Sequence, residues 1–179
     1  TNHDESATTP GVFFAGTITQ GVSGLKKYGI PANSGAVHGF RYNVRLATDE
    51  IAARYFGYQR PRPQVAPDQV VEHMLTSASL APELWHQKSY LAHALARDPD
   101  GVIRDEGIVS LAEYVDASGP DGAAITIETD DHGSIHPAVY VRRRGRVDAD
   151  AVLDESPLTD YRTPAHRAQL VNLLGDVLA

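Results

Sequence analysis

The chain has 179 residues, of which 42% are hydrophobic and 22% charged. This balance is typical of a soluble globular protein with one domain or two small ones, and it excludes a disordered chain, a collagen and a coiled coil. Cysteine is absent, which excludes disulfides, cysteine-ligated zinc and a cysteine nucleophile within these residues. No stretch has the roughly 18 consecutive apolar residues of a membrane span, so we expect no membrane contact and a cytoplasmic location.

The formal net charge of −7 is unevenly distributed. Residues 1–63 carry seven Lys or Arg against four Asp or Glu, whereas residues 64–179 carry nine against nineteen. A chain this acidic is not expected to bind nucleic acid. The basic first third suits either an anionic ligand or a solvated surface. The sequence begins at Thr1 with a polar stretch, so we expect either a processed start or a piece of a longer protein.

A break in composition divides the chain into two units. The sequence around the break reads Arg60-Pro61-Arg62-Pro63. Proline lacks an amide donor and favours extended backbone in the residue before it, so no helix continues through this segment. We therefore expect a linker at residues 58–66, between a first unit at residues 1–57 and an appended α+β domain at residues 67–179.

The first unit is predicted to hold a strand, a glycine-rich loop and a long helix. Residues 12–15, Val-Phe-Phe-Ala, are typical of a strand buried on both faces. Asn33 or Ser34 can cap a helix that runs to about Phe56. Its apolar residues keep a helical period that predicts one buried face: Val37, Phe40, Val44, Ala47 and Ile51. One strand and one helix cannot form a stable core, so we expect this unit to be the end of a larger α/β domain.

The second unit is predicted to be α+β. Helical patterns cover residues 67–75 and 82–95. Three apolar stretches at residues 107–115, 123–128 and 138–143 are separated by turn residues, which predicts an antiparallel meander of three strands. A last helix is expected at residues 164–178, with Thr163 as its cap and Pro164 at its first position.

The most specific pattern combines two segments of the first unit. Residues 9–17 read Thr-Pro-Gly-Val-Phe-Phe-Ala-Gly-Thr, and residues 33–37 read Asn-Ser-Gly-Ala-Val. A strand, a glycine, a loop and a small-residue helix start follow one another. This order resembles the second flavin-binding motif of the FAD-dependent pyridine nucleotide-disulfide oxidoreductases and their flavin monooxygenase relatives. The resemblance covers about residues 9–57, and it implies the C-terminal piece of a Rossmann-like FAD-binding domain.

The resemblance implies flavin contacts at five residues: Gly16, Thr17, Gly35, Ala36 and Val37. A helix N-terminus presents N–H groups and a partial positive charge, so it favours the negative charge that flavin gains on reduction. The family usually has Asp at the position of Thr17, and a hydroxyl offers fewer contacts than a carboxylate. The alternative is that the two glycines serve only tight turns and helix packing.

Two motifs of the family are missing from this sequence. The Gly-x-Gly-x-x-Gly motif that seats the FAD pyrophosphate does not occur, and neither does its counterpart for the nicotinamide cofactor. The resemblance therefore implies an FAD-dependent, NAD(P)H-linked oxidoreductase completed by N-terminal segments or a partner subunit, acting on a small-molecule substrate. The alternative is a non-catalytic binding or assembly module that docks on a partner chain.

Eight histidines raise the question of a metal site. His132 and His136 lie near acidic turn residues, and His86 and His93 are spaced to share one face of a predicted helix. No zinc-type spacing and no His-Glu-x-x-His helix is present, so no metal site is predicted. His38, one turn into the predicted flavin-facing helix, is either a proton donor near the ring or a locally packed side chain.

Two basic features have alternative interpretations. Lys26 and Lys27 lie in the loop of the first unit, where they either meet a phosphate or are solvated. The basic run at residues 142–146 follows a predicted strand. We expect it to contact the acidic domain itself or another subunit.

Overall fold

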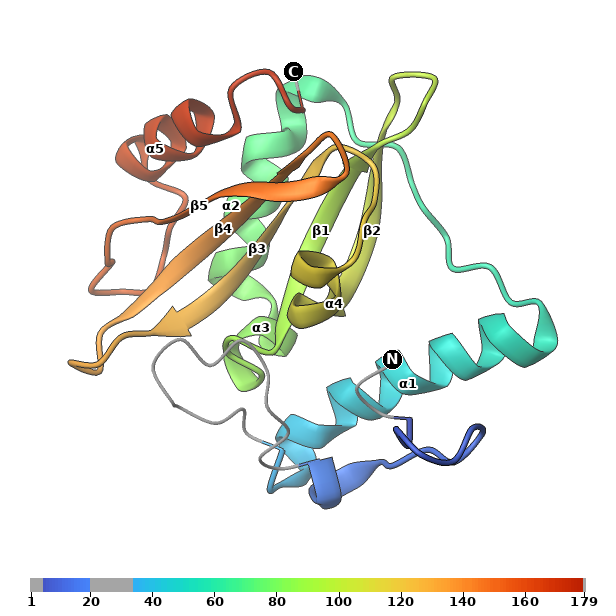
Figure 1. Cartoon of the computed structure of the whole chain (residues 1–179). Helices are drawn as coiled ribbons and strands as arrows, with labels where there is room; N and C mark the ends of the chain where they lie inside the picture. Colours follow the sequence, from blue (N-terminus) through green and yellow to red (C-terminus); the bar gives the residue numbers. More distant parts are fainter. Residues whose placement is uncertain (1–4, 20–33, 179) are drawn as a thin grey trace.

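The computed structural model describes residues 5–19 and 34–178, and its centre is a five-stranded antiparallel sheet with helices on both faces (Figure 1). The strands lie in the spatial order β2-β1-β3-β4-β5. Their bounds are β1 Leu91–Arg97, β2 Ile103–Ser110, β3 Gly122–Thr129, β4 Ile135–Arg143 and β5 Arg146–Val152. The helices are η1 Gly16–Thr19, α1 Val37–Phe56, η2 Pro67–Gln69, α2 Val70–Leu80, α3 Pro82–His86, α4 Leu111–Asp116 and α5 Pro164–Leu174.

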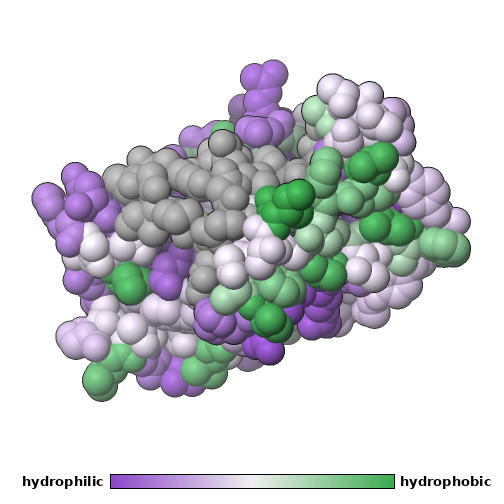
Figure 2. Space-filling view, turned by 90° about the horizontal axis from the view of Figure 1, so that it is seen from below, coloured by the Kyte–Doolittle hydropathy of each residue, from purple (hydrophilic) through white to green (hydrophobic). Residues whose placement is uncertain are grey.

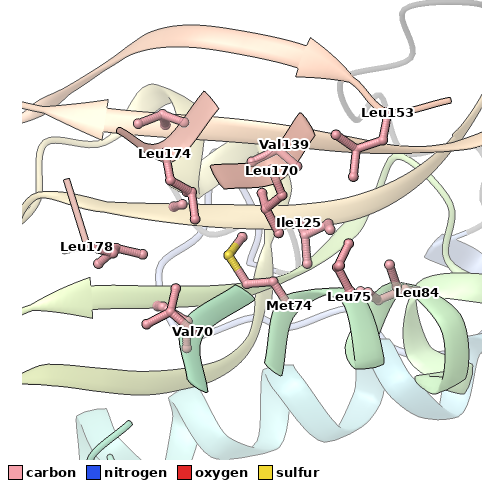
Figure 3. Packing of buried hydrophobic residues seen from close by; sticks show 14 of the residues in the cluster. Val70, Met74, Leu75, Leu84, Ile125, Val139, Leu153, Leu170, Leu174 and Leu178 are labelled. Carbon is pink, nitrogen blue, oxygen red and sulfur yellow. The ribbon is translucent and has the colours of Figure 1, made fainter. Parts of the chain in front are cut away.

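The main core lies between one face of the sheet and the helices α2, α3 and α5. Alternate residues of the central strands point to this face and are buried: Leu91, Leu95, Ile125, Ile127, Val139 and Val141. Figure 3 shows Met74 of α2 and Leu170 of α5 close to Ile125 of β3. These buried apolar side chains supply most of the driving force for folding.

The opposite face of the sheet carries smaller side chains and a second, smaller core. Its buried residues are Ala92, Ala94, Ala124, Ala138 and Tyr140 from the strands, with Leu111 and Tyr114 from α4. The helix α4 begins where the side chain of Ser110 accepts a hydrogen bond from the amide of Glu113. The sheet is therefore covered on both faces, but the thick core lies on the α2 side.

The long helix α1 lies outside this sheet and contacts it through α3 (Figure 1). The ring of His86 in α3 stacks on Tyr42 of α1, with ring centroids 6.0 Å apart. Next to it, Asn43 donates a hydrogen bond of 3.0 Å to Ser34, whose hydroxyl lies 3.3 Å from the side-chain oxygen of Gln87. Ser34, Asn43 and Gln87 are all buried, so α1 is held by a polar and aromatic contact.

The predicted strand at residues 12–15 is wrong. In this segment only Phe13 is bridged, in an isolated pair with Glu5. The physical reason is that a strand needs a neighbour, and no strand of the sheet lies beside this segment. The long helix is confirmed, because α1 ends at Phe56 and Gly57 follows in the left-handed conformation with φ 69°. Its predicted buried face is wrong at Val37, which is 67% exposed.

The predicted helix at residues 82–95 is also wrong beyond its first turn. The helix α3 ends at His86, Ser89 has a φ of 57°, and β1 then begins at Leu91. Leucine and alanine favour helices, but β1 is the central partner of both β2 and β3, and this pairing overrides the local preference. The strand predicted at residues 107–115 ends at Ser110, where α4 begins.

The remaining predictions for the second unit are confirmed in part. The helix α2, with η2 before it, occupies the first predicted helical segment, and β3 and β4 pair as expected. The predicted three-strand meander is wrong in order, because β1 lies between β2 and β3. The last helix begins at Pro164 with Thr163 as its cap, but it ends at Leu174.

Among the described residues, no helix is both long and apolar enough to cross a bilayer.

The predicted linker runs along the outer edge of β2. The amide of Val65 donates to Ile103 O and the amide of Asp105 donates to Pro63 O, both at 2.9 Å. The guanidinium of Arg62 pairs with Glu106 at 2.5 Å, and this carboxylate, followed by that of Asp98, raises the pKa of Arg62. The division into units at residues 1–57, 58–66 and 67–179 stays a prediction, but the last part of the linker is bonded to the sheet.

The main core predicts a sharp difference between two neighbouring residues of α5. Leu170 is fully buried, whereas Val171 is 50% exposed. We expect Leu170→Ala to lower the free energy of unfolding by about 2–5 kcal/mol, because it removes transfer energy and leaves a cavity. Val171→Ala should change it by no more than about 0.5 kcal/mol. Urea denaturation monitored by circular dichroism measures both, and equal losses would contradict the packing described.

The second prediction concerns the independence of the sheet unit. A fragment of residues 63–179 contains all the strands that the structure describes and nearly all of the main core, so we expect it to fold alone. Residues 5–19 and 34–57 contribute no strand to the sheet, so we expect a fragment of residues 1–57 not to fold alone. Dispersed proton NMR spectra and cooperative thermal unfolding should be seen for the first fragment only. Broad, poorly dispersed lines from it would count against this division.

Candidate functional site

The residues predicted to contact flavin lie in two segments, one in η1 and one at the start of α1. Gly16 and Thr17 begin η1, whereas Gly35 and Ala36 lead into α1 and Val37 is its first residue. The helix η1 packs against α1. Figure 1 shows the blue N-terminal segment running back along α1 to η1. Both segments are therefore associated with α1, but the strand that precedes the glycine in the flavin-binding motif is missing from residues 12–15.

The first turn of α1 has no cap from a side chain of the described residues. Ala36 is the N-cap, and the first turn contains no acidic residue. The predicted cap Ser34 is wrong, because its hydroxyl bonds Asn43 and Gln87 instead, and Asn33 lies outside the described residues. The helices α4 and α5 are capped by a Ser and a Thr side chain, whereas α2 and α3 lack a side-chain cap as α1 does. The start of α1 can therefore offer its amides to an acceptor that a ligand brings.

The backbone at Gly16 is open as well as unusual. Its φ is 82°, a conformation that favours glycine, and a Cβ at this position would meet nothing within 4 Å. Thr19 closes the turn by donating its hydroxyl to Gly16 O at 2.8 Å. Thr17 and Gly35 are exposed. The turn therefore leaves space beside Gly16 that no described residue fills.

A polar cluster that the sequence did not predict joins α2 to the sheet. His73 of α2, His93 of β1 and Asp105 of β2 place their ligand atoms within 4.8 Å of one another. His93 Nε2 lies 2.7 Å from Asp105 Oδ1, and His73 Nε2 lies 3.1 Å from Asp105 Oδ2. The two Nε2 atoms are 3.4 Å apart. Three side chains from three elements therefore converge on one point.

A β-bulge aims Asp105 at the two histidines. Ile108 is opposite His93 and Asp105 is opposite Leu95, so one extra residue, Glu106, lies between them. Asp105 and Ile108 are three residues apart, and in a regular strand such residues point to opposite faces of the sheet. The extra residue of the bulge places both on the same face. Gly107 supports the bulge with a φ of 69° and donates its amide to Asp105 Oδ1 at 2.7 Å.

The carboxylate of Asp105 is held in its charged form. Burial raises the pKa of Asp105, but hydrogen bonds from His73 and His93 outweigh burial and hold the pKa well below its usual range. Ser77, one turn after His73 on α2, lies with its hydroxyl 2.7 Å from His93 Nδ1. The cluster therefore contains a charged carboxylate, and one of its histidines is also hydrogen-bonded to Ser77 on the side away from Asp105.

A pocket of about 380 Å³ lies between α1, the linker, α3 and the edge of the sheet. Asp49 and Arg60 in its wall form an ion pair at 2.9 Å, and Arg60 also donates to Ile108 O at 2.6 Å. Tyr42, Tyr58 and Glu83 complete much of the lining. Gly107 lines the pocket and also bonds Asp105, so the bulge belongs to both sites.

The other histidines do not form the arrangements that the sequence suggested. His86 and His93 lie in different elements, so the shared helix face is wrong. His38 packs with its ring centroid 5.1 Å from that of His86, which fits the local-packing interpretation. Burial, and then the nearby His38, lowers the pKa of His86. His132 is exposed in a turn and His136 is buried in β4.

Two residues of the basic run, Arg142 and Arg143, contact the acidic domain itself, as one of the two interpretations predicted. Arg142 is buried and donates to Tyr114 O. Arg143 pairs with Asp148 at 2.9 Å. The suggested phosphate contacts at Lys26 and Lys27 lie outside the described residues.

The cluster of His73, His93 and Asp105 escaped sequence analysis because its members are far apart in the chain and one depends on a bulge. The only local signal is the spacing of His73 and Ser77, which places both on one face of α2. Comparisons of the chain with protein-family models, with curated proteins and with solved structures found no match, so any assignment of function must come from the residues described above.

Proposed function

We propose that the chain is the C-terminal portion of an FAD-dependent, NAD(P)H-linked oxidoreductase, a reductase or a monooxygenase. The observation that carries this proposal is the start of α1, where small residues precede a long helix that no described side chain caps. The FAD ring, when bound, supplies the site that accepts and passes on hydride. The rest of the FAD site and the NAD(P)H site would come from N-terminal segments or a partner chain.

The residues of this chain would orient the flavin and favour its reduced form. The amides of Gly35, Ala36 and Val37 precede the first intrahelical bond, which runs from Gly39 N to Ala36 O at 2.9 Å. Donors at a helix start stabilise negative charge that develops in front of them. The absent side chain of Gly35 and the small one of Ala36 allow a flat ring to approach the backbone.

The second segment, Gly16 and Thr17, would bind the ribityl group of FAD, which leads away from the ring. Gly16 leaves open space beside its backbone, and Thr17 places an exposed hydroxyl next to it. A hydroxyl can donate one hydrogen bond and accept others, which suits the ribityl hydroxyls. The donor set therefore fits the cofactor, although a carboxylate at this position would bind more strongly.

The exposure of apolar side chains supports the view that the first unit is covered by other segments. The described residues include eleven exposed large hydrophobic side chains. Seven belong to the first unit and the adjoining linker: Val12, Phe14, Ile18, Val37, Tyr55, Phe56 and Tyr58. Figure 2 shows apolar side chains gathered on the face seen from below, where α1 and the N-terminal segment lie. Apolar surface gathered in this way is typical of an interface.

The same apolar surface also favours the alternative function, a non-catalytic module that docks on a partner chain. Both functions require a partner surface, but only the first requires flavin. The presence of FAD in the purified assembly therefore separates them.

The test uses the protein purified together with the rest of its flavoprotein. We expect Gly35→Leu to weaken FAD binding by about 1–3 kcal/mol, because a bulky side chain separates the ring from the amides. Thr17→Ala should weaken it less, since one hydroxyl is lost. Ala53→Leu is the matched control, because Ala53 is an exposed small residue near the other end of α1. Flavin content and reduction potential are measured by absorption spectroscopy.

Two results would contradict the proposal. If Gly35→Leu leaves both flavin content and reduction potential unchanged, the start of α1 does not face flavin. If the assembly shows no flavin absorption, even after FAD is added, the non-catalytic module is favoured. A loss of flavin in Ala53→Leu as well would point to general disruption of α1.

A further inference from the structure

We propose that His73, His93 and Asp105 bind one divalent first-row transition-metal ion of the zinc type, with a further coordination position open to solvent. This site is separate from the segments assigned to flavin. Its residues belong to α2, β1 and β2, within the appended domain. Failure of the flavin proposal would therefore leave it intact.

The separations of the three ligand atoms match those of a metal site. They are 2.7 Å, 3.1 Å and 3.4 Å. In a tetrahedral site with bonds of about 2.0–2.1 Å, ligand atoms lie roughly 3.3 Å apart. The side chains therefore need to move by only a few tenths of an ångström to receive an ion. The exposed fractions of 33% for His73 and 16% for Asp105 show that solvent reaches the cluster.

Ser77 holds the ring of His93 so that its Nε2 faces the cluster. Its hydroxyl lies 3.0 Å from the backbone oxygen of His73, one turn earlier in α2, and 2.7 Å from His93 Nδ1. A hydroxyl has one proton, and in a helix it is donated to the carbonyl four residues back. The hydroxyl then accepts from Nδ1–H of His93. This is the outer hydrogen bond that orients histidine ligands in metal sites.

Both imidazoles meet at the carboxylate of Asp105. His93 Nε2 and His73 Nε2 lie 2.7 Å and 3.1 Å from its two oxygens, and protons on these nitrogens satisfy both contacts. Binding of a metal ion releases these protons, because each ligand nitrogen must then present a lone pair. A single metal ion accepts electron pairs from all three side chains at once.

The donor set selects the class of ion. Two imidazoles and one carboxylate suit Zn²⁺ and its first-row neighbours, whereas Mg²⁺ and Ca²⁺ prefer oxygen ligands. Three protein ligands with an open position are the arrangement of catalytic rather than structural zinc sites. The β-bulge at Glu106 also supports a functional site here, because bulges redirect side chains beside such sites.

The experiment uses the full chain without a polyhistidine tag, titrated with Co²⁺ and with Zn²⁺. We expect one Co²⁺ per chain, with visible absorption bands that Zn²⁺ displaces. His73→Gln and Asp105→Asn should each lower the affinity at least about tenfold, and Ser77→Ala should lower it about 10–100-fold. His132→Ala is the matched control, because His132 also lies near an aspartate but outside the cluster. It should leave the affinity unchanged.

A second measurement does not depend on the variants folding. In the unaltered chain, Zn²⁺ should shift the NMR signals of the His73 and His93 rings and leave those of His132 in place. Three results would overturn the proposal: no saturable binding of Co²⁺ or Zn²⁺, equal affinity in a folded His73→Gln variant, or ring shifts confined to other histidines. Mg²⁺ at the same concentration should cause no shift, and equal shifts with Mg²⁺ would also overturn it.

Discussion

The burial of one sheet face beneath α2, α3 and α5 is the constraint on which the rest of the structure depends. It fixes α2 against the sheet with Met74 and Leu75 directed inward, as Figure 3 shows. Once α2 is fixed, its next face brings His73 and Ser77 against the sheet, because helix residues four apart share a face. The polar cluster is thus positioned by the apolar core beside it. Close packing limits the motion of the cluster's side chains. A metal site needs ligands that are held in place in this way.

The attachment of α1 to this core is of a different kind. It depends on the buried hydrogen bonds of Ser34, Asn43 and Gln87 and on the rings around His86. Buried polar contacts are directional, so they define an orientation more than they add stability. They hold the N-terminal turn of α1 next to α3 while the rest of that helix keeps much of its surface exposed. This suits the proposed docking of α1 on further segments or a partner chain.

Local patterns predicted those elements whose sequence and surroundings agree. The helix α1, the pair β3 and β4, and the Thr163 cap follow from periodicity, turn residues and capping. The segment of β1 was predicted as helix because leucine and alanine carry no strand signal, and its conformation is decided by two partner strands. The cluster around Asp105 could not be predicted, since no spacing rule reports a bulge. The flavin contacts stay a prediction from the resemblance.

The path of the linker has a consequence for association between copies of the chain. An open sheet edge is a template for adding strands from other molecules. Residues 63–65 already bond the free edge of β2, and Pro61 and Pro63 have no amide to offer a further strand. The opposite edge, β5, alternates charged residues such as Asp148 and Asp150. A fragment that begins after the linker would keep most of the core but would expose the edge of β2. We therefore expect this shorter fragment to aggregate more readily than one that includes the linker.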